Sequence, residues 1–227
     1  MARTPRPDFQ VSPRLGEDLT VFDDAITDDL VVSARTLSGR GLGGSVAHLV
    51  DLEECRWERS SLADAHLTKL TATDQIFDNC DLALLKAPDA SVTRAVLTQC
   101  RLSGVTMTGA TLQHVEVTDA VADFAGFRFG RFKQVRFERC RLTNADFSGV
   151  TFDQVVFRDC DLTEAEFHQA RVSSAWFINC RWDRSAGAES LRGATIAQSN
   201  PMDHLALLAQ LAHALGIKLA DPDDLPA

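Results

Sequence analysis

Histidine and cysteine are the residues of this chain best suited to nucleophilic or metal chemistry, and the sequence contains six of each. Metal sites use closely spaced groups of these residues, and covalent catalysis places a general base beside the nucleophile. The sequence contains no CxxC pair, HExxH motif or nucleophile elbow, and its histidines are dispersed: His48, His66, His114, His168, His204 and His213. We therefore predict no catalytic residue, no metal site and no cofactor, and we expect a protein that is not an enzyme.

Two further patterns have both a chemical and a structural interpretation. Residues 39–44 are rich in glycine, as phosphate-binding loops are, but no Gly-Lys-Ser or Gly-Lys-Thr sequence follows them. We interpret this segment as a turn.

Asp159 and Asp161 would act as an acid–base pair only inside a cleft, and we expect them to be solvated carboxylates on a surface.

The cysteines follow a period of five residues rather than a ligand spacing. Each lies two positions before a large apolar residue, in a register that small residues occupy: Cys55, Cys80, Cys100, Cys140, Cys160 and Cys180. This placement indicates small buried side chains. Free thiols of this kind suit a reducing cytoplasm.

The same period of five runs through most of the chain. Every fifth residue from Leu52 to Trp182 is apolar, at all 27 positions, and the residue two places earlier is Ala, Cys, Val, Gly or Ser at 24 of them. The exceptions are Leu70, Gln75 and Leu85. Neither the 3.6-residue period of a helix nor the two-residue period of a strand fits this spacing. A fixed short period over so many residues is typical of a solenoid, in which each repeat stacks on the next.

Composition divides the chain into five segments. We predict a flexible arm over residues 1–16, an N-terminal cap or imperfect first coil over 17–49, the repeat solenoid over 50–197, a capping helix over 198–219 and a disordered tail over 220–227. One face of the expected helix is apolar: Leu205, Leu208, Leu211, Ala212 and Leu215. Because the open end of a stack of strands exposes apolar layers, we expect this helix to cover the last coil and to form a homodimer contact.

Charge and hydropathy limit the classes of partner. The net charge of −9 disfavours direct binding of nucleic acid, which requires basic residues that neutralise phosphates. No stretch approaches about 18 uncharged apolar residues, and the N-terminus lacks the apolar region of a secretory signal. We expect a soluble, cytoplasmic protein that does not contact the membrane and that binds other proteins.

Several segments match the pattern A-[DN]-[LF]-x-x, with a small first residue and a large third one. They are ADFSG at 145–149, CDLTE at 160–164, AEFHQ at 165–169, CDLAL at 80–84 and CRLTN at 140–144. On these segments the chain resembles the pentapeptide repeat family over roughly residues 45–197. The resemblance implies an all-β solenoid, a right-handed quadrilateral β-helix with four pentapeptides per coil and a C-terminal capping α-helix.

A coil of 20 residues predicts which side chains stack. One inward column would hold Cys80, Cys100, Ala120, Cys140, Cys160 and Cys180, and another would hold Trp57, Phe77, Leu97, Val117, Phe137, Phe157 and Phe177. On the surface, Asp81 would lie beside Arg101, and Arg141, Asp161 and Arg181 would follow one another in the same column. Adjacent opposite charges at strand spacing are modestly favourable.

One outward column carries apolar residues in four coils, Ile76, Val96, Val156 and Trp176, and is interrupted by Glu116 and Arg136. Exposed apolar residues can mark a partner surface. Alternatively, the N-terminal segment folds over them, or they are scattered and bind nothing. Phe124 and Phe129 also fall outside the two inward registers.

Two functions agree with these observations. The first is a scaffold that binds a protein partner which the sequence does not identify. The second is implied by the resemblance, because a mycobacterial fluoroquinolone-resistance protein and the plasmid quinolone-resistance proteins of this family form dimers that mimic DNA. These dimers bind the type II topoisomerases DNA gyrase or topoisomerase IV, and inhibit the enzyme or protect it from drugs. The unbroken repeat frame resembles the loop-free mycobacterial type.

A basic band counts against the second function. It contains Arg128, Arg131, Lys133, Arg136, Arg139 and Arg141. A DNA mimic should present extended negative faces, so we favour the protein-binding scaffold and keep the topoisomerase inhibitor as the alternative.

Overall fold

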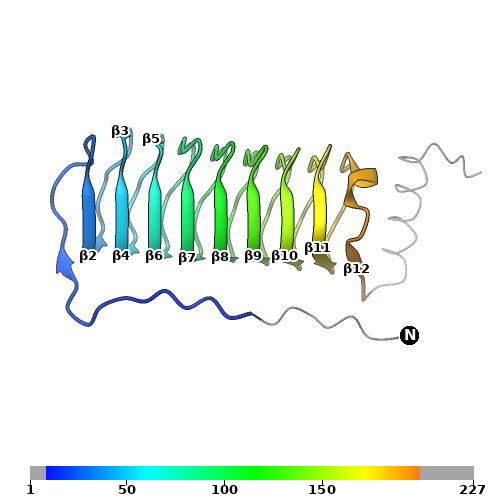
Figure 1. The fold of residues 1–227 in the computed structure, drawn as a ribbon, viewed down its shortest axis with the longest axis horizontal. Helices are drawn as coiled ribbons and strands as arrows, with labels where there is room; N and C mark the ends of the chain where they lie inside the picture. The colour runs from blue at the N-terminus through cyan, green and yellow to red at the C-terminus, as the bar shows by residue number, and fades with distance from the viewer. Residues whose placement is uncertain (1–8, 200–227) are drawn as a thin grey trace, which may run out of the picture.

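The computed structural model describes residues 9–199, which wind into a parallel β-solenoid of about eight turns (Figure 1). The strands stand side by side in a ten-stranded sheet of order β1-β2-β4-β6-β7-β8-β9-β10-β11-β12. Its eight-residue strands are β2 (Val31–Ser38), β4 (Asp51–Glu58), β6 (Thr71–Asp78), β7 (Ser91–Thr98), β8 (Thr111–Thr118), β9 (Arg131–Glu138), β10 (Thr151–Arg158) and β11 (Arg171–Ile178). The shorter elements are β1 (Thr20–Val21), β12 (Thr195–Ala197), the 3-10 helix η1 (Ala188–Leu191), and β3 (Val46–His48) paired with β5 (His66–Thr68).

Successive coils stack with a register of 20 residues. Thr71 of β6 pairs with Ser91 of β7, and isolated bridges such as Asp81 to Arg101 continue the ladder on the other sides of the coil. The prediction of four pentapeptides per coil is therefore confirmed. We name the four sides A to D in chain order. In the coil of residues 51–70 they are centred on Leu52, Trp57, Leu62 and Leu67.

Both inward registers fill the core, as the period of five predicts. The largest fully buried side chains include Trp57, Phe132, Phe137, Phe147, Phe152, Phe157, Phe167 and Phe177. Stacked phenylalanines continue from coil to coil, with ring centroids 5.1 Å apart for Phe137 and Phe157 and 4.9 Å apart for Phe157 and Phe177. All six cysteines are buried as well. Burial of these apolar side chains is the main stabilising contribution to the fold.

The chain turns nearly every corner through a residue with a positive φ angle, and Ser174 of β11 is an exception. Asp64, Phe124 and Phe129 have φ of 57°, 57° and 61°, and Gly104 has 68°. Only this left-handed region lets the backbone turn sharply while the preceding and following inward residues keep their direction. The corner side chains consequently point away from the core, whatever their polarity.

The two ends of the solenoid differ from its middle. At the N-terminal end, Phe22 and Ile26 are buried against the first coil, and Val31 already pairs in register with Asp51. At the C-terminal end, Trp176 of β11 pairs with Thr195 of β12, so the last coil is one residue shorter than the others. The predicted helix face of Leu205, Leu208, Leu211, Ala212 and Leu215 lies outside the described residues, as does the predicted tail over 220–227.

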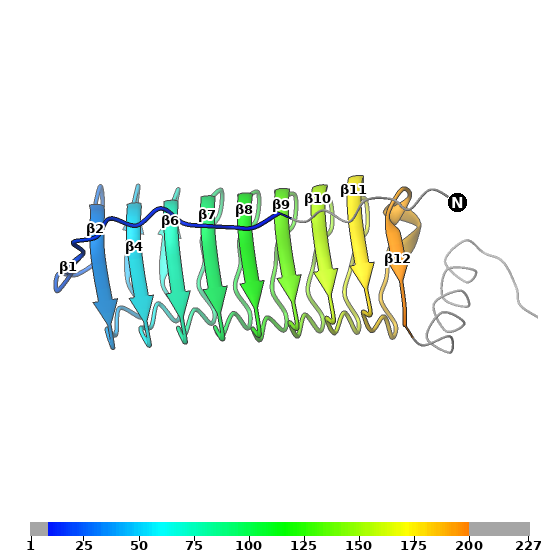
Figure 2. The ribbon, with the colours of Figure 1, turned by 90° about the horizontal axis from the view of Figure 1, so that it is seen from below.

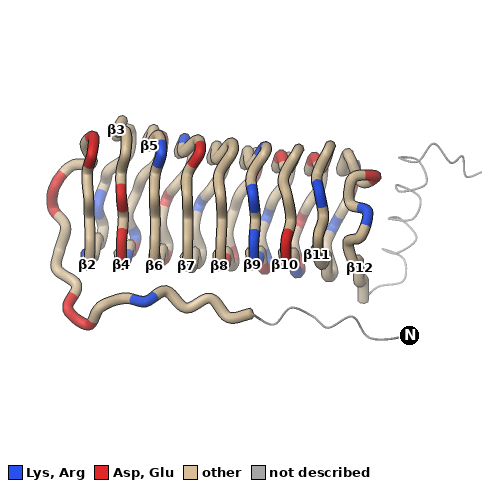
Figure 3. Tube along the Cα trace, viewed as in Figure 1, with Lys and Arg blue, Asp and Glu red and all other residues tan. Residues whose placement is uncertain are grey.

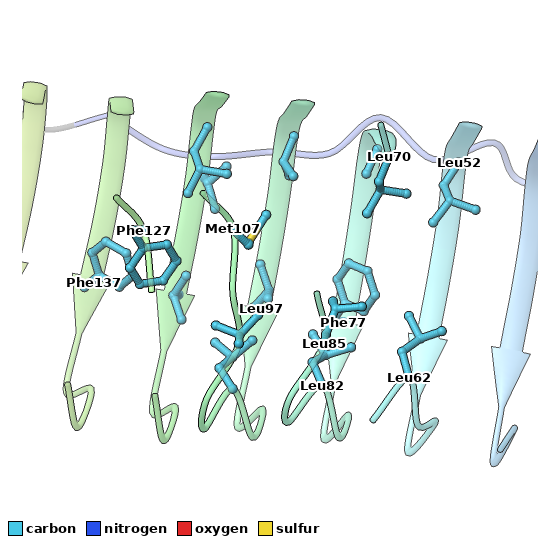
Figure 4. Close-up of a pocket in the computed structure, with 17 residues that line it drawn as sticks. Leu52, Leu62, Leu70, Phe77, Leu82, Leu85, Leu97, Met107, Phe127 and Phe137 are labelled. Atoms are coloured by element: carbon cyan, nitrogen blue, oxygen red, sulfur yellow. The ribbon is translucent and has the colours of Figure 1, made fainter. Parts of the chain in front are cut away.

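The interior is packed unevenly. In the coil of residues 91–110 the inward large residues are Val92, Leu97, Leu102 and Met107, whereas later coils carry phenylalanine. Next to this coil lies a cavity of about 80 Å³ (Figure 4). Only apolar side chains line it, among them Leu52, Phe77, Leu97, Met107, Phe127 and Phe137. A cavity without polar groups stays dry, so this space represents lost packing.

We predict that Leu97→Phe stabilises the protein by about 1 kcal/mol, because the larger ring fills part of this cavity and stacks towards Phe77. Equilibrium unfolding in urea would measure the change. Leu142→Phe is the matched control, because Leu142 is fully buried and does not line the cavity. Overpacking at that position should cost about 1–3 kcal/mol. Equal destabilisation by both substitutions would contradict the prediction.

Candidate interaction surfaces

Charged residues on the outside of the solenoid are arranged in pairs of opposite sign. Arg101 lies 3.4 Å from Asp81, and Arg139 lies 2.7 Å from Asp119 in the next coil. Arg139 also lowers the pKa of the Asp119 carboxyl. Pairs of this type are exposed to solvent, which screens their attraction, so they contribute little to stability. The predicted column of alternating charges is confirmed, since Arg141, Asp161 and Arg181 occupy consecutive ladder positions.

The pairing neutralises much of the basic band. Arg128 contacts Asp146 at 3.0 Å, and Arg141 contacts Asp123 at 2.5 Å. Among the described residues, each of the four sides carries both acidic and basic side chains (Figure 3). The described part of the solenoid therefore presents no extended face of negative charge.

The cysteine column consists of free thiols, as the sequence indicates. The neighbouring Cys160 thiol and burial both raise the pKa of the Cys140 thiol, and burial raises the pKa of Cys55. A raised pKa keeps the thiols of Cys140 and Cys55 protonated, and a protonated thiol is neither a nucleophile nor a good metal ligand. The pKa of Cys80 is instead lowered by a hydrogen bond with the Cys100 thiol. Within residues 9–199 no group of three or more histidine, cysteine or acidic residues is arranged to hold a metal ion.

Asp159 and Asp161 take part in surface hydrogen bonds. Asp159 accepts one from Asn179 at 3.1 Å, and Asp161 accepts one from the backbone N–H of Thr163 at 3.0 Å. The first bond joins neighbouring coils and the second closes a turn within one coil. The two residues do not line the internal cavity. We therefore assign them a structural contribution.

Two exposed phenylalanines lie at adjacent corners of one coil. Phe124 is 67% exposed at the corner between sides C and D, and Phe129 is 54% exposed at the far corner of side D. Between them, side D carries Gly126. Leu84, which is 55% exposed, occupies the same corner as Phe124 two coils earlier. We call Leu84, Phe124 and Phe129 the apolar corner patch.

Glycines make room for these side chains. A Cβ atom on Gly149 would lie 2.6 Å from Cδ1 of Phe129, and one on Gly104 would lie 2.8 Å from Cδ2 of Leu84. The ring and the leucyl group thus lie over neighbouring glycines instead of extending freely into solvent. The Arg128 guanidinium stands 5.5 Å from the Phe129 ring centroid and adds a cation–π contact. These contacts hold the patch in a defined shape.

The predicted partner column is less exposed than its sequence suggests. Val156 is only 1% exposed, because its ladder neighbours Arg136 and Trp176 carry larger side chains on both sides of it. Ile76, Val96 and Trp176 are half-buried. Val156 therefore offers no surface to a partner in this structure, and the other three residues offer only part of theirs.

The N-terminal segment crosses this column. Residues 9–16 run along the solenoid from β9 to β4 and lie across the strands (Figure 2). Hydrogen bonds tie Gly16 to Glu54, Arg14 to Asp74 and Phe9 to Arg136. Residues 9–16 thus fold over part of the outward column, which is the alternative that the sequence left open. This part of the predicted flexible arm is packed on the solenoid.

Two family models match the solenoid. One, described as a pentapeptide repeat region, matches residues 130–197, and the other, described as pentapeptide repeats in eight copies, matches residues 89–121. Both matches lie within the stacked coils, between β7 and β12. The chain is a pentapeptide-repeat protein.

Solved structures similar to this pentapeptide-repeat protein share little sequence with it. HetL from the cyanobacterium Nostoc, described as involved in heterocyst differentiation regulation, is 14% identical, with 74% of this chain and 87% of HetL covered and a TM-score of 0.37. A trypsin-treated form of QnrB1, a plasmid-mediated fluoroquinolone resistance protein, is 16% identical, with 86% and 90% covered and a TM-score of 0.43. Rfr23 from the cyanobacterium Cyanothece is 12% identical, with 69% and 90% covered and a TM-score of 0.21.

These values are too low to transfer a function to the pentapeptide-repeat protein. No curated protein matches it. Between residues 9 and 199, no helix has the length and apolar character that crossing a membrane would require.

Proposed function

We propose that this pentapeptide-repeat protein is a non-enzymatic scaffold that binds a protein partner on side D, at the apolar corner patch. The observation that carries the proposal is the exposure of two phenylalanines at the two corners of that side. A corner residue in the left-handed region is usually glycine, asparagine or aspartate, so a phenylalanine there has a conformational cost and no benefit to the core. Binding to a partner would supply that benefit.

The chemistry of the patch supports a protein partner. Aromatic side chains are enriched at the centres of protein interfaces, where they fill pockets of the partner and dominate the binding free energy. Gly126 leaves a flat area between Phe124 and Phe129 that a partner backbone can approach closely. Arg128, beside Phe129, lies at the edge of this area and offers a polar contact.

The test compares two double variants of the intact chain. Phe124→Ser with Phe129→Ser removes the patch, and Val31→Ser with Val46→Ser removes two equally exposed apolar side chains from the first coil. We expect the wild type and the Val31/Val46 variant to capture at least one host protein in equal amounts. The Phe124/Phe129 variant should capture more than tenfold less of the same protein. Quantitative mass spectrometry of affinity-captured material measures this ratio. Identical capture by all three proteins would contradict the proposal.

The second candidate function is binding to a type II topoisomerase as a DNA mimic. The net charge of −9 favours it. The paired charges of the described sides weaken it, because a mimic of DNA needs continuous negative potential. A DNA gyrase supercoiling assay, with and without a fluoroquinolone, separates the two candidates. We expect no change in supercoiling or in drug-induced cleavage, and dose-dependent inhibition or protection would establish the DNA mimic instead.

Assembly and location form part of the same proposal. We propose a homodimer, formed through the predicted C-terminal helix, that acts in the cytoplasm. The six unpaired thiols support a reducing compartment. Light scattering measures the molar mass of the intact chain and of a Leu208→Asp, Leu211→Asp variant. We expect a dimer for the intact chain and a monomer for the variant. The same mass for both proteins would contradict the assigned contact.

A further inference from the structure

The segment 9–16 is attached to the solenoid mainly by its backbone. The N–H of Gly16 donates to Oε2 of Glu54 at 3.2 Å, and the N–H of Arg14 donates to Oδ1 of Asp74 at 2.9 Å. The carbonyl oxygen of Phe9 accepts from Nη2 of Arg136 at 3.1 Å. Every extended peptide offers these backbone groups, so they recognise conformation and not sequence.

Two apolar side chains of the segment supply the remaining contacts. The Phe9 ring lies 5.2 Å from the Arg136 guanidinium in a cation–π contact. Val11 is only 7% exposed. Since Arg14 is fixed at Asp74 and Phe9 at Arg136, Val11 crosses the two coils between them. The outward side-B residues of this column in those two coils are Val96 and Glu116.

The segment is not part of the β-sheet. Residues 9–18 form no strand, and the first residue that pairs with the solenoid is Thr20 of β1. The segment can therefore leave the surface without breaking a single ladder hydrogen bond of the coils. Its departure would uncover Ile76 and Val96, and the side-chain carboxylates of Glu54 and Asp74 would lose the backbone N–H groups that the segment donates to them.

One polar group of the site is fixed independently of the segment. Asp74 is almost completely buried and receives two hydrogen bonds of 2.6 Å from the Arg94 side chain. This bidentate pair holds the carboxylate in place, so the acceptor for a peptide N–H is already oriented when the segment is absent.

We propose that the surface under residues 9–16, where Ile76 and Val96 lie, is a binding groove for an extended peptide of a partner protein, and that residues 9–16 are its intramolecular occupant. The recognised peptide carries an aromatic residue and, two positions later, an aliphatic residue, as Phe9 and Val11 do. The partner must displace the segment before it binds. This groove lies on sides A and B and is separate from the apolar corner patch on side D.

The experiment uses the full-length chain and a fluorescein-labelled peptide with the sequence FQVSPRLG of residues 9–16. In the variant Phe9→Ser, Val11→Ser the tethered segment is weakened. In the wild type it competes at an effective concentration on the order of millimolar. We expect fluorescence anisotropy to show at least tenfold tighter peptide binding to the variant than to the wild type. Circular dichroism and thermal unfolding of both chains verify that the solenoid is intact.

Three controls define the specificity. A peptide with serine in place of both apolar residues should not bind. An alanine-based peptide that keeps only the phenylalanine and the valine at the same spacing should bind within about tenfold of the original, since the backbone supplies the other contacts. Adding Val96→Asp to the weakened variant should abolish binding, whereas adding Phe124→Ser and Phe129→Ser should leave it unchanged.

Equal affinity for the wild type and the weakened variant, or no binding at millimolar peptide, would overturn the proposal. So would binding that depends on the proline and arginine of the peptide and not on its two apolar residues. The groove is tested by peptide binding, and the partner site on side D is tested by capture of a host protein with the Phe124/Phe129 variant. The two proposals can therefore fail independently, and the results show which one is wrong.

Discussion

Replacing Phe157 with alanine is expected to lower the free energy of unfolding by about 3–5 kcal/mol. Phe157 is fully buried, and its ring stacks on Phe137 at 5.1 Å and on Phe177 at 4.9 Å. It also meets Phe147 edge-on at 5.5 Å. The ladders above and below fix the backbone, so the coil cannot collapse into the space that the ring leaves.

Phe129→Ala is the matched control for this prediction. It removes the same side chain from the same fold, but Phe129 is exposed at a corner. We expect a change of about 0.5 kcal/mol or less there. Urea unfolding measures both variants, and hydrogen exchange shows whether the coils next to Phe157 open first, as expected for a stack of nearest-neighbour units. A loss below about 1 kcal/mol for Phe157→Ala would contradict the assigned packing.

The second large effect is expected at Gln75, which lies in the register of small residues. Gln75 is fully buried, and its Oε1 accepts a hydrogen bond of 2.9 Å from Nε1 of Trp57. Its Nε2 donates to the carbonyl oxygens of Leu52 at 3.1 Å and Thr73 at 2.8 Å. Gln75→Ala leaves the buried indole N–H without a partner and creates a cavity, so we expect a loss of about 3 kcal/mol.

A double-mutant cycle isolates the contribution of the indole. In a Trp57→Phe background no N–H is left unsatisfied, so the additional cost of Gln75→Ala should fall by at least about 1 kcal/mol. Gln154→Ala, at an exposed corner, is the control and should change stability little. Equal costs of Gln75→Ala in both backgrounds would show that the hydrogen bond contributes nothing.

The coil architecture could be predicted from the sequence because the period of five directly assigns inward and outward positions. The stacking columns followed from the 20-residue coil, and the structure confirms them at the cysteines and at the Phe137, Phe157 and Phe177 rings. The hydrogen bond between Trp57 and Gln75 was not predicted. Gln75 stood out as an exception to its register, but its partner lies 18 residues earlier and in a different register, on the coil below.

The surfaces were harder to predict because outward positions have no pattern that the fold requires. Phe124 and Phe129 were recognised as outward residues, yet Leu84 was missed, although it shares their corner register. The packing of residues 9–16 left no periodic signal, since three backbone hydrogen bonds and Val11 hold the segment. Burial of Val156 depends on how the larger side chains beside it are oriented. The five-residue period assigns Val156 to an outward position but carries no information on the orientation of its neighbours.

The 20-residue register has a consequence for how such a protein can change its length over evolution. Duplicating a whole coil would lengthen the solenoid and leave every downstream side chain on its original side. Duplicating a single pentapeptide would keep both inward registers and turn everything after it by a quarter of a revolution. The groove under residues 9–16 and the apolar corner patch occupy the same coils, between Glu54 and Arg136. Duplication of a whole coil on either side of them would leave both surfaces intact, whereas duplication of one pentapeptide within these coils would break up both surfaces and still keep the inward registers.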